Sequence, residues 1–344
     1  MQEKMTAHNL RELFAKTRMP VMVAPMFLVS SPELVVASSR AGIVGTYAAP
    51  NARNIAALDE ALSVISAGTA ERGAAPWALN MIVHSSYDRF DAELELVLQY
   101  QPKIVTTALG SPRRVLQHVH GYGGFVMADV ATPAMARKAV EAGVDGLILV
   151  CAGAGGHTGT YHPFSFVDEV KQFWNGPIGL AGAISGGAHV RAVQQIGADF
   201  AVLGTRFIAA EESMAQPEYR DMLVESNMED LVASKAVSGV LANWLRPTLD
   251  RAGLSATQLS EEKKIDFSGN ISTAPKAWKD VWSAGHGVGA VTAIEPLSAI
   301  VDRLAKEYAK CLTSEREAIK RLSDQLENWE AADAPVAGGQ GVMQ

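Results

Sequence analysis

The chain has 344 residues, of which 48% are hydrophobic and 19% charged, a composition that supplies a large core and excludes intrinsic disorder. Its 30 basic and 37 acidic residues give a net charge of −7, which argues against a nucleic-acid partner, since a phosphate backbone is bound by a basic face. The length suits a (β/α)8 barrel of about 250 residues with an accessory element.

Cysteine usage and the apolar runs indicate a cytoplasmic protein. Cys151 and Cys311 are too few for a disulfide framework, so reduced thiols are expected. The first residues lack the apolar segment of a secretory signal. The longest apolar runs, such as Val144–Ala154, are interrupted by charge and glycine, so no membrane partner is expected.

Short apolar runs recur along the chain with helical patterns between them. Most are apolar at every position, which is typical of parallel strands covered on both faces. The expected strands are Val21–Met26, Ile43–Ala48, Trp77–Val83, Lys103–Leu109, Phe125–Val130, Gly146–Cys151, Ile178–Ala183 and Phe200–Phe207. Eight βα units favour an α/β fold of the (β/α)8 TIM-barrel class. An open, doubly wound sheet is the alternative, because it uses the same units.

Start and stop signals mark several of the expected helices. Ser31 and Pro32 suit an N-cap and a first helical residue, and Thr132 with the following proline repeats the pattern. The helix after Thr132 is expected to close at Gly143, and another at Gly197, because glycine adopts the left-handed conformation that ends helices.

The strand–helix alternation breaks after Phe207. Residues 211–278 are more polar, and we expect them to form an inserted cap or lid over the barrel. Helices are expected within this cap near Pro217–Asn227 and Ser255–Lys264.

The barrel domain is therefore expected to comprise residues 1–210 and 279–310. A long amphipathic helix from Pro296 would supply its eighth helix. Residues 311–344 would add a C-terminal helical stretch near Ser314–Glu330, packed on the outside, and a flexible tail.

Two segments rich in small residues follow the last two expected strands: Ala181–Gly187, with the sequence AGAISGG, and Leu203–Phe207, with the sequence LGTRF. TIM barrels perform their chemistry at the C-terminal ends of the strands and commonly bind phosphate after strands seven and eight. Small residues let backbone N–H groups approach an oxyanion, and the first segment leads into a helix N-terminus that favours an anion. These loops predict a phosphate site, the alternative being tight turns that need a positive φ.

The sixth expected strand ends in CAGAGGHTG, Cys151–Gly159, where glycines surround His157. Glycines let the backbone lie close to a flat ligand. An imidazole, with an ordinary pKa of about 6.5, takes a proton from a weak carbon acid or donates to a developing anion. A lone loop histidine is more commonly structural, but its place at a strand end makes His157 the candidate catalytic residue.

Other chemistry has less support in the sequence. His84, His162 and His286 lie near the expected mouth, but no pair has the HxxxH spacing of a helical metal site, so no metal is expected. Cys151 fits a small core residue better than a nucleophile. A Walker loop and a GxSxG elbow are absent, and the glycine-rich run 121–124 precedes a strand, whereas a dinucleotide fingerprint follows one.

With these residues the sequence resembles the FMN-dependent nitronate monooxygenase family, formerly called 2-nitropropane dioxygenases. That family also includes flavin enoyl-ACP reductases and NADH:quinone reductases of the same fold. The resemblance covers about Pro20 to Val291. It rests on VMVAPMF at 21–27, LN at 79–80, EAGVDGLILVCAGAGGHTG at 141–159, GPIGLAGAISGG at 176–187, GADFAVLGTRF at 197–207 and WSAGHGVGAV at 282–291. The combination is specific for the superfamily and less specific for one reaction.

The resemblance implies that FMN is the cofactor and that His157 matches the catalytic histidine of the family. The positions that would bind FMN are Pro25, Met26 and Phe27 at the edge of the isoalloxazine ring, Asn80 hydrogen-bonded to it, Gly155 and Gly156 close to the flavin, and Gly182, Ala183, Gly204 and Thr205 at the phosphate.

Several positions depart from the family pattern. Many members have Gln and Glu where this chain has Val150 and Gly153, and a second glycine where it has Ala183. Some reductases carry a lysine at the position of Asp129. Family members commonly have the sequence AGQ where this chain has AGH, at residues 284–286, so His286 replaces a glutamine. These differences concern the substrate more than FMN binding.

The function implied by the resemblance is the FMN-dependent oxidation of alkyl nitronates, and of nitroalkanes, by O2 to a carbonyl compound and nitrite. His157 would take the α-proton of a neutral nitroalkane or pair with the nitro oxygens of a nitronate. The alternatives are an NAD(P)H-dependent flavin reductase of quinones or enoyl thioesters, a non-redox enzyme with a phosphate ligand, and a flavin-binding protein without turnover. The oligomeric state stays open, with the C-terminal helices favoured as barrel cladding over an interface.

Overall fold

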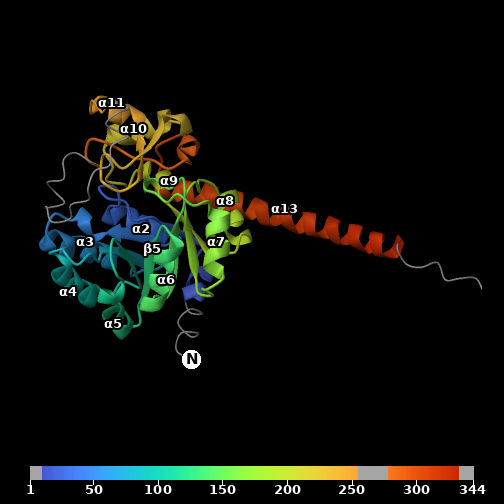
Figure 1. Ribbon diagram of the computed structural model, residues 1–344, viewed down its shortest axis with the longest axis horizontal. Coiled ribbons are helices and arrows are strands. Elements are labelled where there is room, and N and C mark those ends of the chain that lie inside the picture. The colour runs from blue at the N-terminus through green and yellow to red at the C-terminus, as the bar shows by residue number, and fades with distance from the viewer. Residues whose placement is uncertain (1–9, 255–277, 333–344) are drawn as a thin grey trace, which may run out of the picture.

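The structure, a computed structural model that describes residues 10–254 and 278–332, is a barrel of eight parallel strands enclosed by helices (Figure 1). The strand order is β1-β9-β8-β6-β5-β4-β3-β2. The strands are β1 (Val21–Val23), β2 (Gly45–Ala48), β3 (Trp77–Ile82), β4 (Ile104–Ala108), β5 (Phe125–Val130), β6 (Gly146–Val150), β8 (Ile178–Ala181) and β9 (Phe200–Leu203). The ring closes where Val23 N donates to Val44 O at 2.8 Å and Val44 N to Val21 O at 3.1 Å. The predicted TIM-barrel class is confirmed.

The helices follow the strands around the outside of the barrel. They are α2 (Pro32–Arg40), α3 (Ile55–Gly68), α4 (Phe90–Tyr100), α5 (Arg113–Gly121), α6 (Pro133–Ala142), α7 (Pro163–Lys171), α8 (Gly187–Gln195) and the first part of α13 (Leu297–Ala332). The expected caps are present: Ser31 Oγ accepts from Leu34 N at 2.9 Å, and Gly143 ends α6 with φ +96°.

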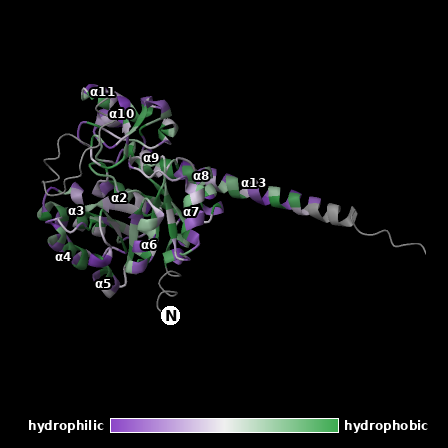
Figure 2. Ribbon diagram, in the orientation of Figure 1, coloured by the Kyte–Doolittle hydropathy of each residue, from purple (hydrophilic) through white to green (hydrophobic). Residues whose placement is uncertain are grey.

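The core has two layers because successive strand residues face opposite sides of the sheet. Val21 and Val23 of β1 face the surrounding helices, whereas Met22 faces the barrel interior. Green, the hydrophobic colour, accordingly runs along strands of the barrel in Figure 2. The lower end of the barrel is closed by an N-terminal helical turn, whose Phe14 ring stacks on Phe200 with centroids 3.9 Å apart.

An accessory layer covers the C-terminal end of the barrel (Figure 1). It contains α10 (Pro217–Glu225), which confirms one expected helix of the cap, and α11 (Arg246–Arg251). It also contains β10 (Leu231–Ser234) and β11 (Ala242–Leu245), an antiparallel pair that the sequence analysis did not anticipate. The expected helix Ser255–Lys264 lies outside the described residues.

The C-terminal region differs from the expected two helical stretches. It is one continuous helix, α13 (Leu297–Ala332), whose first turns pack against α2 and α8 and complete the helical ring. Residues 333–344, expected as a tail, lie outside the described residues. Among the helices of the described residues, none has an apolar stretch long enough to cross a membrane.

Candidate active site

Four loops meet at the C-terminal mouth of the barrel and hold one another through their backbones. The carbonyl of Gly153, after β6, accepts from Ala183 N at 3.2 Å and from His286 N at 2.9 Å. Thr205 Oγ1, after β9, accepts from Gly285 N at 2.8 Å. The segments that resemble family motifs, although far apart in the sequence, therefore form one junction.

His157 stands at this mouth on a short strand of its own. It belongs to β7 (Gly156–His157), which pairs with β11 so that His157 lies opposite Ala242. The buried Asn243 side chain donates to Ala154 O at 2.8 Å and fixes the preceding turn. The accessory layer thus supplies the support that the glycine-rich loop lacks.

The surroundings of His157 favour its neutral form. The Trp278 ring lies at 89° to the imidazole, with centroids 5.5 Å apart. The side chain is exposed at the mouth, but protein lies close on several sides, and this desolvation lowers its pKa below the ordinary 6.5. A neutral imidazole has one nitrogen free to accept a proton.

A layer of polar side chains lies inside the barrel below the mouth. Thr46, Asn80, Thr106 and Asp129 come from four consecutive strands, β2 to β5, above the apolar interior. Asn80 Nδ2 donates to Thr106 Oγ1 at 2.9 Å and lies 3.5 Å from Asp129 Oδ2. The hydroxyl oxygen of Thr46 and Oδ1 of Asp129 are buried without a partner among the described residues.

The other half of the mouth, formed by β6, β8 and β9, is lined by small residues. Gly155 is needed for close approach, because a Cβ there would lie 2.7 Å from Gly285 N. Gly182 has φ +132°, and Ala183 keeps a left-handed φ of +55° at the position where many family members have glycine. A Cβ at Gly204 would make only ordinary contacts, 3.5 Å from Ala24 Cβ and 3.6 Å from Met26 Sδ, and the Gly204 N–H makes no hydrogen bond to another described residue.

The expected anion site at the start of α8 is already filled by the protein. Gly187 N donates to Glu307 Oε2 of α13 at 2.7 Å, so a carboxylate occupies the positive end of that helix. The phosphate site itself stays a prediction. Its candidate backbone donors are Gly182 and Ile184, in the loop after β8, and the first turn of α9 (Thr205–Ile208).

The remaining candidates are dispersed around the rim. Pro25, Met26 and Phe27 follow β1 at the mouth and are half-buried, and Met26 O accepts from Asn51 Nδ2 at 3.1 Å. The His286 ring lies beside Gly153. These positions agree with a shared site, while the roles assigned to them stay predictions.

Three other residues considered in the sequence have structural explanations. His84 Nδ1 lies 2.8 Å from Ser86 Oγ. His162 caps α7. Cys151 is fully buried, and burial raises its pKa to about 12, so it is not a thiolate nucleophile. In the described part of the chain, no group of three His, Cys, Asp or Glu side chains is placed to hold a metal ion.

Fold and site together define an enzyme of the TIM-barrel class with an imidazole at its mouth. The model of the nitronate monooxygenase family matches residues 9–307, and the chain belongs to this family of oxidoreductases. It is 25% identical to a nitronate monooxygenase of Paraburkholderia phytofirmans, over 87% of this chain and 94% of that one. It is 26% identical to a nitronate monooxygenase of Pseudomonas aeruginosa, over 66% and 76% of the two chains.

Solved structures support the fold. A nitroalkane oxidase from Streptomyces ansochromogenes matches with a TM-score of 0.75 and 24% identity, over 88% of this chain and 99% of that one. FabK from Thermotoga maritima matches with a TM-score of 0.72 and 23% identity, over 90% and 98% of the two chains. Because enzymes with different names share this architecture to a similar degree, the fold alone does not choose the reaction.

The mouth has the chemistry that an FMN molecule needs. Asp129 and Thr46 present unpartnered polar atoms to one side, as the edge of a flat polar ring requires. On the other side, Gly204 has no side chain, and its N–H is without a hydrogen-bond partner among the described residues, as a phosphate site requires. The residues present therefore fit the cofactor that the family resemblance implies.

Proposed function

We propose that this protein is an FMN-dependent enzyme that oxidises alkyl nitronates, and nitroalkanes after deprotonation, with O2 to a carbonyl compound and nitrite. The observation that carries the proposal is the place of His157, an imidazole at the mouth of the barrel that β11 holds through β7. The names of relatives and neighbours, nitronate monooxygenase and nitroalkane oxidase, support the substrate class.

His157 performs the proton chemistry in this proposal. A neutral nitroalkane is a weak carbon acid, and the free ring nitrogen of His157 takes its α-proton. With a preformed nitronate, which has already lost that proton, the ring N–H pairs with a negative nitro oxygen. The same side chain therefore serves both substrates, with proton transfer needed for only one.

Binding and orientation belong to the rest of the mouth. FMN, when bound, supplies the electron acceptor for the oxidation. Asn80 would hydrogen-bond its ring system, Gly155 and Gly156 would border it, and Gly204 and Thr205 would hold its phosphate. Trp278 and β11, the strand that pairs with β7, border His157.

The test is a pair of assays on the FMN-loaded protein. The first measures nitrite and carbonyl product from an alkyl nitronate in air, and we expect both to form with O2 consumption. The second mixes the enzyme anaerobically with NADH or NADPH. Rapid bleaching of the flavin, together with no nitrite in the first assay, would replace the proposal with the reductase alternative.

A further inference from the structure

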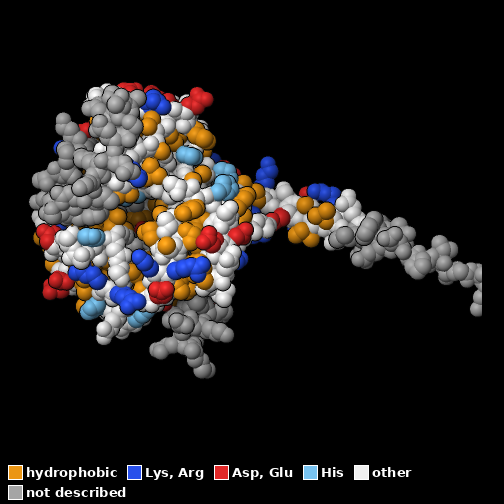
Figure 3. All heavy atoms as spheres, in the orientation of Figure 1, with side chains coloured by type: hydrophobic (Ala, Val, Ile, Leu, Met, Phe, Trp, Pro, Cys, Tyr) orange, Lys and Arg blue, Asp and Glu red, His pale blue; other side chains and the backbone are white. Residues whose placement is uncertain are grey.

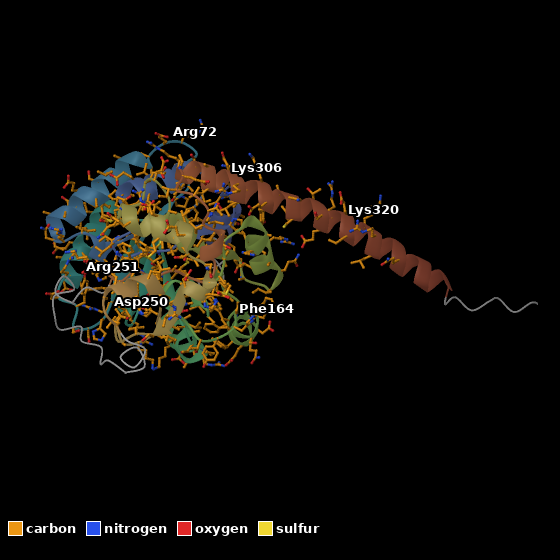
Figure 4. All side chains as sticks on the ribbon, turned by 90° about the horizontal axis from the view of Figure 1, so that it is seen from above. Arg72, Phe164, Asp250, Arg251, Lys306 and Lys320 are labelled. Carbon is orange, nitrogen blue, oxygen red and sulfur yellow. The ribbon has the colours of Figure 1, made fainter. Side chains whose placement is uncertain are left out.

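The helix α13 continues far beyond the body of the protein. Its first turns are buried at Leu297, Val301 and Leu304. The described contacts to the body include Tyr308 with Gln194 and Glu315 with Arg191 at 2.8 Å. Beyond Glu315 the helix projects into solvent for 17 further residues, about 25 Å (Figures 1 and 4), and Figure 4 places Lys320 on this projecting part.

The projecting helix carries an apolar stripe with the spacing of a coiled coil. Leu312, Ile319 and Leu322 are 41%, 60% and 57% exposed, and their separations of seven and three residues place them at a and d positions of a heptad. The amino-acid sequence repeats this spacing at Leu326 and Trp329. Figure 3 shows hydrophobic side chains gathered on this projecting part of α13, residues 316–332, which is called the arm from here on.

Leaving such an apolar stripe exposed to water is energetically unfavourable for the helix. An isolated helix of this length is marginal in water, and helices in proteins owe most of their stability to packing of the apolar face. The family match ends at residue 307, so the arm lies outside the part of the chain that relatives share. Its apolar face therefore serves a purpose separate from the barrel chemistry.

The charges of the arm select its partner. Residues 310–321 contain four basic side chains and two acidic ones, one of which, Glu315, is already bound to Arg191. The sequence 322–332 contains three acidic residues and no Lys or Arg. A second arm laid antiparallel brings the basic half of each helix against the acidic half of the other, whereas a parallel arm opposes like charges.

Orientation also separates the bodies. Each body lies at the N-terminal end of its own arm, so parallel arms would force two bodies against each other. Antiparallel arms place the bodies at opposite ends of the pair. In that arrangement a positions face d positions, and a pairing that begins beyond Glu315 puts Leu322 opposite position 326 of the second copy.

We propose that residues 316–332, the part of α13 beyond its contacts to the body, pair with the same segment of a second copy of this chain as an antiparallel two-helix coiled coil. The interface is isologous, with the same patch used on both chains, and it closes at two subunits. The dimer joins two barrels through their arms and leaves both mouths outside the interface.

The mass of the FMN-loaded full chain in solution tests the pairing. Sedimentation equilibrium is expected to give twice 36.6 kDa for the natural protein. Ile319→Glu places a charge in the apolar seam and is expected to weaken dimerisation at least about tenfold. Ser314→Glu, outside the a and d positions of the same helix, is the matched control and stays dimeric. A monomeric natural protein, or a dimer insensitive to Ile319→Glu, overturns the proposal.

The orientation is tested with a spin label on Cys311, the other cysteine being fully buried. With Leu322 opposite position 326, two Cys311 residues are 26 positions apart along the pair, about 39 Å at 1.5 Å per residue. Electron–electron double resonance is expected to report a distance near this value. A distance near the spacing of adjacent helices, about 10 Å, would show parallel arms and overturn the antiparallel assignment.

Discussion

At the scale of single residues, His157 is the side chain on which the proposed chemistry depends. His157→Asn keeps a hydrogen-bond donor of similar size but accepts no proton at neutral pH. We expect normal FMN binding, a loss of about 10²–10⁴-fold in kcat/KM for a neutral nitroalkane, and a smaller loss for the matching nitronate. The measurement is kcat/KM for both forms of one substrate. Equal losses would mean that His157 acts on a step the two share.

Asp129 makes the stability of the FMN-free protein depend on pH. Burial raises its pKa from 3.8 to about 7, so the folded state holds a proton that the unfolded state releases near pH 4. Stability is therefore lost as the pH rises from about 4 to 7, by at most about 4 kcal/mol for three pKa units. Asp129→Asn removes this cost.

The measurement for Asp129 is the melting temperature of both FMN-free proteins. The advantage of Asp129→Asn over the natural protein is expected to be larger at pH 8 than at pH 5. Because every other titrating group is present in both proteins, its contribution cancels in the difference. An advantage that does not change with pH would contradict the assignment.

Gly204 separates steric from electrostatic effects at the proposed phosphate site. A Cβ there would lie 3.5 Å from Ala24 Cβ and 3.6 Å from Met26 Sδ, which are ordinary contacts. Gly204→Ala is therefore expected to retain FMN. Gly204→Asp adds a negative charge at the loop that would hold the phosphate and is expected to weaken binding on the order of 100-fold or more. Flavin fluorescence titration measures FMN binding by both variants. Full FMN occupancy in Gly204→Asp would show that the phosphate does not bind at this loop.

At the scale of elements, the strand β11 decides how rigidly the glycine-rich loop is held. Asn243→Ala removes the donor to the Ala154 carbonyl and leaves it unpaired, at a cost of about 1–3 kcal/mol. We expect a lower urea midpoint and a reduced kcat with any nitronate, since β7 loses its support. The control is Asn227→Ala, an exposed cap in the same layer, which is expected to leave kcat unchanged. Equal effects of Asn243→Ala and Asn227→Ala on kcat would show that β11 does not position the glycine-rich loop.

The sequence predicts the barrel strands well because burial on both faces leaves an apolar run in each. It does not predict β10 and β11, which are short, and β11 has Asn243 at its centre, a residue depleted in strands. Nor does it predict Glu307 at the start of α8, because that contact joins residues 120 positions apart. The candidate loops follow from local glycine patterns, whereas their mutual hydrogen bonds arise only from the closed barrel.

At the scale of the whole molecule, the arm and the barrel are expected to be separable. Ending the chain after Glu315 keeps the Glu307 contact to α8 and the ion pair to Arg191. The shortened protein is expected to bind FMN as the full chain does. Its melting temperature is expected to be independent of protein concentration, whereas that of the full chain rises with concentration, because association stabilises the folded form. A concentration-independent full chain would contradict this.

The Phe14 ring, stacked on Phe200, closes the N-terminal end of the barrel. Side chains fill its lower interior to the density of a protein core. In the described part of the chain, reactants therefore have no route through the N-terminal end of the barrel. Under the proposed function, substrate and product would enter and leave at the mouth beside His157, and a product that has not left would block the next substrate. Turnover would then depend on passage through this mouth, which the accessory layer borders.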